Sequence, residues 1–240
     1  MLKCFIRNSI ILLLAFSVNV SAQDVEEEEE ARPAIVDSAH QLRLGFDVSR
    51  LLFNELQKDK EVRKSYELEM DFYWRKDMYL VAEGGWGTAS LKYSDLSYNS
   101  SNVFFRAGIN KSLLPRMSQR DWDMAFIGLR YGLGLINRGD ANYTITDSAW
   151  GTFSGSVPAT HLTAHWIELT GGVRVEVAKY VFIGWNMRGK FLVNAKKFVE
   201  LPPYNIAGYG KGEKNSVFDF NIYLSYALRW DRKHIPAPKE

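Results

Sequence analysis

Hydrophobic and polar residues alternate along eight stretches of this chain, all of them after residue 41. In the last stretch, an aromatic or aliphatic side chain occupies every second position from Phe218 to Trp230. Successive side chains of a β-strand point to opposite faces, so each stretch predicts a strand with one apolar and one polar face. The predicted strands are residues 42–50, 65–74, 78–88, 102–110, 122–137, 163–178, 181–193 and 216–230.

The connections between these strands are alternately long and short. The long, polar connections are residues 55–64, 89–101, 138–162 and 194–215, whereas residues 75–77 and 179–180 are tight turns. Long external loops and short periplasmic turns are typical of outer-membrane barrels. The pattern therefore predicts an all-β fold, an eight-stranded antiparallel transmembrane β-barrel over residues 42–230 with long extracellular loops and periplasmic termini.

One connection departs from this arrangement. Residues 111–121 are long for a periplasmic turn and combine basic with apolar side chains. One interpretation is an ordinary loop interrupted by Pro115. The other is a contact with a partner protein or with phospholipid headgroups.

The first 22 residues have the composition of a secretory signal peptide. Lys3 and Arg7 precede an apolar run over residues 10–18, and small residues close the segment at Ala22. Neither this run nor any later stretch reaches the roughly 20 apolar residues that a membrane-spanning helix requires. We expect residues 1–22 to be a signal peptide, residues 23–41 an acidic, disordered periplasmic arm, and residues 231–240 a periplasmic C-terminal tail.

Composition argues against several other kinds of function. The chain has 30 Lys and Arg against 28 Asp and Glu, and removal of the signal peptide takes away Lys3 and Arg7 and leaves 28 of each. No net positive charge therefore favours nucleic acid as a partner. The single cysteine, Cys4, lies in the signal peptide, so we expect no disulfide, thiolate metal site or reactive thiol in the mature chain.

Alternation alone does not say which face of the barrel is inside, because a soluble lipocalin-like barrel turns its apolar face inward around a ligand. Glycine, which leaves room for a close neighbour, recurs on the polar face at Gly45, Gly85, Gly108, Gly128, Gly132, Gly134, Gly172 and Gly184. Charges of both signs share that face, and six of its seven basic residues are arginine, which suits buried pairs. These charges are Arg43, Asp47, Glu67, Glu69, Asp71, Glu83, Arg106, Arg130, Glu168, Arg174, Glu176, Arg188, Lys190, Asp219 and Arg229. We predict that they lie inside and plug the lumen against conduction.

The large aromatic residues support the same orientation. One set lies at the predicted periplasmic strand ends: Trp74, Trp122, Tyr180 and Trp230. A second set lies at the opposite ends: Tyr66, Trp86 and Trp166. Two such belts match the interfacial girdles that flank the apolar band of a transmembrane barrel. We therefore expect Leu44, Val175 and Ile222, on the apolar face, to contact outer-membrane lipid.

The final strand carries a more specific likeness. Its residues Tyr223, Leu224, Tyr226, Leu228 and Trp230 resemble the C-terminal signal that the barrel-assembly machinery recognises, although residues 231–240 follow the last aromatic. Over about residues 42–230, the chain resembles small outer-membrane barrels of the OmpA and OmpX type, and the uncharacterised barrel proteins of Bacteroidota whose domain family has no assigned function. The resemblance implies an outer-membrane location and assembly by that machinery, and it brings no catalytic motif.

Candidate metal ligands are few. The mature chain has four histidines: His40 and His234 in the terminal arms, and His161 and His165 at the start of the sixth predicted strand. A His-x-x-x-His pair binds metal when a helix brings both rings to one face, but no helical period surrounds this pair. Asp140 and Asp147 could add ligands. Ordinary strand-end histidines are the simpler interpretation, and we expect no metal and no cofactor.

Catalytic signals are equally sparse. Ser225 and His165 are the available nucleophile and base for lipid hydrolysis, and they would have to meet on one barrel face. No nucleophile-elbow, phosphate-loop or paired-carboxylate motif accompanies them. We therefore expect no catalytic residues, and a lipid-modifying barrel enzyme stays an alternative. A second alternative is a secreted lipocalin-like barrel that binds an apolar ligand.

The long external loops carry the remaining functional signal. Residues 142–156 combine Tyr143, Trp150 and Phe153 with small polar residues, a composition suited to recognition. Residues 201–212 combine a Pro-Pro bend with three glycines, which predicts a rigid bend and then a flexible segment. These loops either pack on one another or form a partner-binding surface. We expect a structural or interaction role, as a stand-alone envelope protein or as an accessory subunit of a larger outer-membrane assembly for secretion, barrel assembly or uptake.

Overall fold

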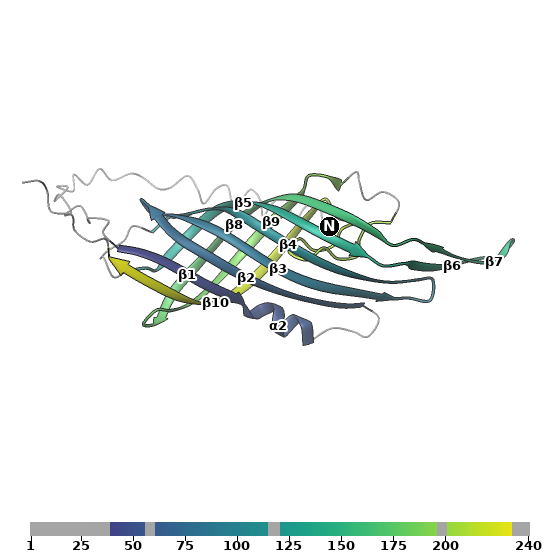
Figure 1. Cartoon of the computed structure of the whole chain (residues 1–240), viewed down its shortest axis with the longest axis horizontal. Coiled ribbons are helices and arrows are strands. Elements are labelled where there is room, and N and C mark those ends of the chain that lie inside the picture. Colours follow the sequence, from purple (N-terminus) through teal and green to yellow (C-terminus); the bar gives the residue numbers. More distant parts are fainter. Residues whose placement is uncertain (1–38, 56–60, 115–120, 196–200, 232–240) are drawn as a thin grey trace, which may run out of the picture. The chain divides into compact units, whose positions relative to one another are not determined.

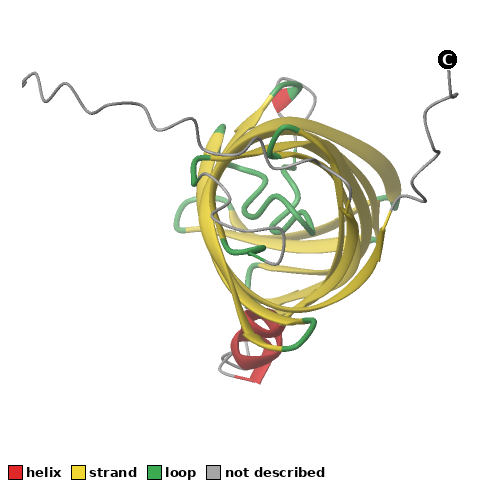
Figure 2. Ribbon diagram, turned by 90° about the vertical axis from the view of Figure 1, so that its left-hand side faces the viewer, coloured by secondary structure: helices red, strands yellow, loops and turns green. Residues whose placement is uncertain are grey.

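The computed structural model describes residues 39–55, 61–114, 121–195 and 201–231, which form a closed β-barrel. Neighbouring strands are antiparallel throughout, and the pairing of β3 with β4 closes the sheet on itself (Figures 1 and 2). The barrel strands are β1 (Ala39–Asp47), β2 (Glu61–Arg75), β3 (Met78–Lys92), β4 (Leu96–Ser112), β5 (Met124–Arg138), β8 (Thr160–Ala178), β9 (Val181–Leu192) and β10 (Ser216–Asp231). The predicted eight-stranded antiparallel barrel is confirmed.

Several predicted segments lie outside the described residues. These are the signal peptide, most of the acidic arm and most of the C-terminal tail. The middle of the connection at residues 111–121, with Pro115, lies outside them too, so its two interpretations both stay predictions.

β3 and β4 extend further than predicted at the end with the long connections. β3 and β4 stay paired as far as Lys92 and Ser97, so the loop predicted at residues 89–101 is wrong. Only residues 93–95 separate these two strands. In this part the strands carry mostly small polar residues, so the apolar alternation disappears although the backbone ladder continues.

The first strand is shorter than predicted at the same end. β1 ends at Asp47, and the predicted strand residues 48–50 instead begin the helix α2 (Val48–Glu55). Asp47 caps this helix, because its carboxylate accepts hydrogen bonds from the backbone N–H and the hydroxyl of Ser49, at 2.9 and 2.6 Å. Further along, the Asn54 side-chain amide donates to the backbone carbonyl of Ser65 and accepts from its N–H, each at 3.1 Å. The helix is thus fastened to β2.

The connection predicted as a loop at residues 138–162 contains an additional hairpin that is not part of the barrel wall, made of β6 (Ala141–Asp147) and β7 (Gly151–Val157). β6 pairs with β4 at Leu96 and Ser97, and the hairpin then continues past the ends of the barrel strands (Figure 1). The two predicted tight turns are confirmed, at residues 76–77 and 179–180. The hairpin belongs to a connection predicted to be external, and α2 leads into another, the one predicted at residues 55–64.

The outward face of the wall is apolar. In the central part of each described barrel strand, no Asp, Glu, Lys or Arg occupies an outward position. Large hydrophobic side chains are exposed there instead, among them Leu44, Met70, Phe105, Leu129, Leu169, Val175, Ile183, Met187, Leu224 and Leu228. None of the described helices is long and apolar enough to cross a membrane.

Candidate functional site

The inward face of the barrel carries a connected network of buried ion pairs. At its centre the Arg106 guanidinium contacts three carboxylates, those of Glu67, Glu83 and Glu168. The Arg188 guanidinium reaches the same three and lies 2.9 Å from Glu67 and from Glu83. All five side chains are almost completely buried. Each carboxylate therefore meets more than one guanidinium, an arrangement that offsets the cost of removing charge from water.

The network continues toward the tight-turn end of the barrel. The Arg174 guanidinium bridges Glu69 and Asp71, at 2.5 and 2.7 Å. The Arg43 guanidinium donates to the same Asp71 carboxylate at 3.0 Å. Arg130 links this group back to the centre, because it pairs with both Glu83 and Glu69.

At the loop end, the network closes with Arg50, a cation that the sequence prediction did not place in the lumen. The Lys190 ammonium lies 2.6 Å from the Asp219 carboxylate, and the Arg50 guanidinium of α2 pairs with Asp219 and with Asp47. The predicted list had eight acidic and seven basic residues, and Arg50 supplies the eighth base. In a continuing strand, Arg50 would point outward, so only the turn into α2 could bring it inside.

A largely aromatic layer fills the lumen below the charges, at the tight-turn end. Its members are Tyr73, Tyr79, Trp122, Met124, Phe126, Phe182 and Ala227. Two arginines border this layer: the Arg43 guanidinium lies 4.9 Å from the ring centre of Tyr79, and that of Arg229 lies 5.4 Å from Trp122. Cations stack favourably on aromatic faces. The layer therefore lies between the Arg43–Asp71 pair and this end of the barrel, where a part-exposed pair joins Arg229 to Glu176.

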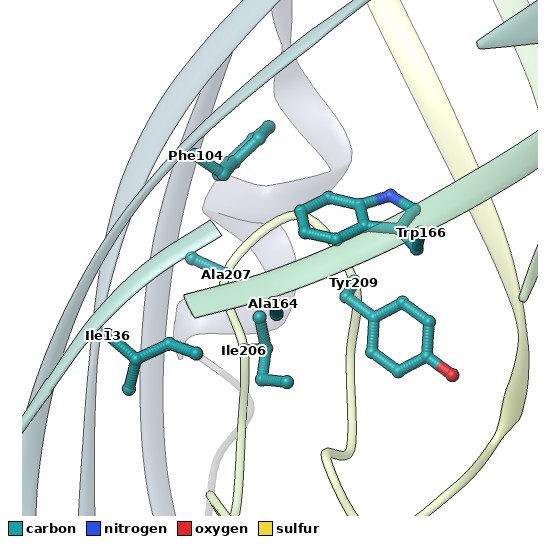
Figure 3. Close-up of a cluster of buried hydrophobic side chains, with 7 residues drawn as sticks. All are labelled: Phe104, Ile136, Ala164, Trp166, Ile206, Ala207 and Tyr209. Carbon is teal, nitrogen blue, oxygen red and sulfur yellow. The ribbon is translucent and has the colours of Figure 1, made fainter. Parts of the chain in front are cut away.

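A loop folds into the lumen from the opposite end and forms a second apolar layer. Ile206, Ala207 and Tyr209 of the connection between β9 and β10 pack against Phe104, Ile136, Ala164 and Trp166 (Figure 3). We call residues 205–211 the plug loop; Figure 2 shows loop segments inside the ring of strands. Each fully buried large apolar side chain contributes roughly 1.5–3 kcal/mol. The glycine segment predicted here does not lie free in solvent, since most residues of the plug loop are buried against the barrel wall; its flexibility stays a prediction.

Luminal cations hold the plug loop in place. The Gly208 carbonyl accepts hydrogen bonds from Lys190 at 2.7 Å and from Arg106 at 3.2 Å. Gly208 has a φ of +79°, and a side chain there would meet the Phe104 ring. Burial raises the pKa of the Tyr209 phenol to about 12, so its hydroxyl stays protonated and donates to the Lys214 carbonyl at 2.5 Å.

Glycine makes room for this packing, as predicted. A side chain at Gly132 would overlap the Trp166 indole, which lies across the neighbouring strand at that register. A side chain at Gly108 would collide with Arg130 and with the backbone of Leu129. At these two registers, the narrow lumen accommodates a large side chain because the facing strand has none.

The aromatic belts are correct in part. Trp74, Trp86 and Trp230 are exposed on the outward face, and Tyr66 packs beside Trp86 with ring centres 5.5 Å apart. Trp122 and Trp166 are instead buried in the lumen, so their assignment to the belts is wrong. Their position on the strand could have shown this, because Trp166 lies two residues before the luminal Glu168, and Trp122 lies two before Met124.

The structure separates the candidate catalytic residues. Ser225 is buried in the lumen, whereas His165 lies on the outward side of β8, where its Nδ1 is 2.6 Å from the Tyr131 hydroxyl. The two side chains therefore do not share a barrel face.

The candidate metal ligands are not brought together either. The His161 Nδ1 lies 2.6 Å from the Asn137 side-chain oxygen. His40 belongs to β1 and not to a terminal arm, and its ring stacks on Trp230. His234 lies outside the described residues. In the described part of the chain, no three His, Cys, Asp or Glu side chains form a metal-binding group.

A family model for a domain of unknown function, DUF6048, matches residues 1–233 of the chain. The chain belongs to this family. No curated protein matches this DUF6048 member.

Solved structures similar to this DUF6048 protein are small bacterial barrels. Ail, the attachment invasion locus protein of Yersinia pestis, in complex with the heparin analogue sucrose octasulfate, is 8% identical, with a TM-score of 0.41 over 80% of this chain and 100% of that chain. Neisserial surface protein A is 11% identical, with a TM-score of 0.37 over 82% and 97% of the two chains. The N-terminal β-barrel domain of Pseudomonas aeruginosa OprF is 9% identical, with a TM-score of 0.29 over 80% and 98%.

Proposed function

We propose that the protein is an integral outer-membrane β-barrel with a non-enzymatic structural or interaction role. The observation that carries this proposal is the polarity of the wall, which has ion pairs inside and an uncharged apolar band outside. A soluble protein rarely exposes so large an apolar surface. In a bilayer the same wall contacts acyl chains, and the paired strands satisfy one another's backbone hydrogen bonds. The secreted lipocalin-like alternative requires the opposite polarity.

The lengths of the connections support an orientation. The end with tight turns at residues 76–77 and 179–180 faces the periplasm. The end with α2, the plug loop and the β6–β7 hairpin faces the cell exterior. Both termini then lie in the periplasm. The aromatic residues of β10 suit recognition by the barrel-assembly machinery during insertion.

The filled lumen argues against a channel. An apolar layer lies at each end, and the fully buried ion pairs lie between them. A conduction path needs connected water, whereas these buried charges pair with one another across the lumen. The protein therefore offers its surface, and not a pore, for function.

The β6–β7 hairpin supports an interaction role. Trp150 is 79% exposed at its tip, and Ile145 and Phe153 are also exposed. Solvated tips usually carry small polar residues, and exposed aromatic side chains are typical of binding surfaces. We propose that the hairpin contacts a larger outer-membrane assembly, in which this barrel is an accessory subunit.

Two experiments test this proposal. Membrane fractionation with heat-dependent gel mobility should recover a heat-modifiable barrel from the outer membrane, and recovery from the soluble periplasm would reject it. Affinity purification in mild detergent should then recover a larger outer-membrane complex in stoichiometric amounts. The Trp150→Ser/Phe153→Ser variant should lose that complex, while the matched Thr144→Ser/Thr152→Ser variant keeps it. Equal recovery with both variants would remove the hairpin from the interface.

A further inference from the structure

A cavity of about 660 Å³ lies on the outer side of the barrel wall, at the end with the long connections. Small and polar residues of β3, β4, β5 and β8 form most of its lining. Six of the lining side chains carry a hydroxyl, amide or imidazole group on an outward position: Thr88, Ser90, Asn99, Ser101, Asn137 and His161. The cavity therefore opens away from the plugged lumen, on the surface of the barrel.

These polar side chains form two adjacent rows across the strands. In one row, Thr88 lies opposite Ser101, and Ser101 lies opposite Asn137. Asn137 in turn lies opposite His161. In the other row, Ser90 lies opposite Asn99. Directly opposed side chains in antiparallel strands have Cβ atoms about 4.5–5.5 Å apart, so the rows present closely spaced polar groups.

Most of these groups are available to a ligand. In the part of the chain that the structure describes, the side chains of Thr88, Ser90, Asn99 and Ser101 form no hydrogen bond. The His161 Nδ1 lies 2.6 Å from the Asn137 side-chain oxygen, which can only accept. In the neutral ring Nδ1 therefore carries the proton, and Nε2 is an acceptor. The cavity thus offers donors and acceptors together.

The cavity presents no charged group to a ligand. Among its described lining residues only Arg138 is charged, and its side chain is buried on the luminal face, where the guanidinium donates to the Pro158 carbonyl at 2.9 Å. Lys64 lies opposite Thr88 and is exposed, but it does not line the cavity. An ion would lose hydration in this lining without meeting a counter-charge, so the lining suits a neutral ligand rich in hydroxyl groups.

Hydrogen bonds hold the upper wall of the cavity in place. The Gly139 N–H donates to the Asn99 carbonyl at 2.9 Å, and the Ala159 N–H donates to the Asp140 carboxylate at 2.8 Å. With the bond from Arg138 to Pro158, these contacts fix both segments that join the barrel to the β6–β7 hairpin. A cavity that is already formed loses little conformational entropy when a ligand binds.

The cavity lies directly above the apolar band of the wall. On β3, β4 and β5, the outward positions change from Trp86, Val103 and Leu135 to Thr88, Ser101 and Asn137 at its lower edge. Trp86 is 49% exposed and packs beside Tyr66 in the exposed aromatic belt. Such belts mark the level of the lipid headgroups. The polar rows therefore begin where a lipid headgroup meets water.

We propose that this cavity binds the uncharged sugar headgroup of a glycolipid from the outer leaflet, an inference that rests on the proposed membrane location. The sugar hydroxyls exchange hydrogen bonds with Thr88, Ser101 and His161, and the C–H groups of the ring contact Val62 and Ala159, which also line the cavity. The acyl chains then lie along the apolar band below. A phospholipid phosphate meets no cation in this lining, and a diacylglycerol leaves the polar rows unpaired.

Native mass spectrometry of the full chain in a sugar-free detergent, lauryldimethylamine oxide, tests this binding. The separate probes are dioleoyl glucosylglycerol, dioleoylglycerol, dioleoyl phosphatidate and methyl glucoside. We expect glucosylglycerol lipid to bind, and the other three to bind at least about tenfold more weakly. Equal binding of phosphatidate would overturn a neutral headgroup as the ligand, and equal binding of methyl glucoside would overturn a lipid as its source.

Matched variants locate the binding. Thr88→Val/Ser101→Ala removes two opposed hydroxyls from the cavity and should weaken the glycolipid about tenfold. Thr144→Val/Ser154→Ala removes the same groups from an opposed pair on the hairpin, outside the cavity, and should bind as the wild type does. Equal weakening by the two variants would overturn the site.

Two single variants test the shape and the charge of the site. Ser101→Trp fills the cavity from an outward position and should weaken the glycolipid at least about tenfold while the barrel stays heat-modifiable. Lys64→Gln should leave binding unchanged, and a loss as large as that of the cavity variant would overturn a neutral ligand. A heat-modifiable chain that floats with vesicles but binds no glycolipid would disprove this inference alone. A chain that fails to insert would disprove the proposed membrane function as well.

Discussion

Removing Arg106 should destabilise the barrel more than removing any exposed charge. Its guanidinium contacts Glu67, Glu83 and Glu168, and all four side chains are almost completely buried. Without it, Glu168 keeps only Arg188 as an ion-pair partner in the described network, at 3.8 Å, and the lumen gains an uncompensated negative charge. Breaking a buried pair by removing one partner costs about 3–5 kcal/mol. We expect Arg106→Met to lose stability in this range.

The charge-balanced variant separates this cause from the loss of packing. In Arg106→Met/Glu168→Gln, the lumen is neutral again, and the amide oxygen of the introduced glutamine could still accept the 2.6 Å hydrogen bond that Trp166 donates to Glu168. We therefore expect the double variant to recover at least about 1.5 kcal/mol of the loss. Lys92→Met, at an exposed strand end, should change stability by less than about 0.5 kcal/mol.

Urea unfolding of the refolded chain in detergent micelles measures these differences, with tryptophan fluorescence and heat-dependent gel mobility as two probes. A loss below about 1 kcal/mol for Arg106→Met would refute the reasoning, because that is the range of an exposed ion pair. A double variant no more stable than the single one would show that charge imbalance is not the cause.

Three further predictions concern the wall and the lumen. Leu44→Arg, Val175→Arg and Ile222→Arg should each reduce the heat-modifiable fraction, at about 2–4 kcal/mol near the midplane, and tolerance of all three would contradict a lipid-facing wall. Gly132→Ala should destabilise the barrel by about 1–3 kcal/mol in urea unfolding because it meets Trp166, whereas Gly171→Ala, with only ordinary contact, should not; equal effects would contradict the close packing. Ile206→Ser/Tyr209→Ser should lower stability yet leave planar bilayers without conductance steps, since the aromatic layer at the other end remains; open channels would refute that layer's role as a seal.

Much of this fold could be predicted from the sequence because a barrel strand is described by one alternating pattern. The side of the strand assigned to Arg43, Glu67 or Arg188 follows from counting by two, and their burial confirms it. The pattern carries no information where both faces are polar. The sequence prediction therefore ended β3 and began β4 too close to the middle of the barrel, and it missed the part of their ladder that continues to Lys92 and Ser97. The pattern also cannot register the end of β1, since Val48 and Ser49 continue the alternation while the capped helix has already begun.

The position of the plug loop lay beyond such reasoning. A loop with Ile206 and Tyr209 could pack on other loops or enter the lumen. It can enter only if the facing glycines leave space, and that space exists only once the barrel has closed. Trp166 is different, because its place in the alternation already put it inside.

The most direct test of the central claim is the environment of successive residues along one strand. Single cysteines placed from Phe220 to Leu228 in a Cys4→Ser background, spin-labelled and reconstituted in lipid, report collisions with oxygen and with a water-soluble nickel reagent. The structure predicts an alternation of period two, with oxygen reaching the labels at Phe220, Ile222 and Leu224 and neither reagent reaching those between them. High nickel accessibility at the outward positions would contradict a wall that faces lipid.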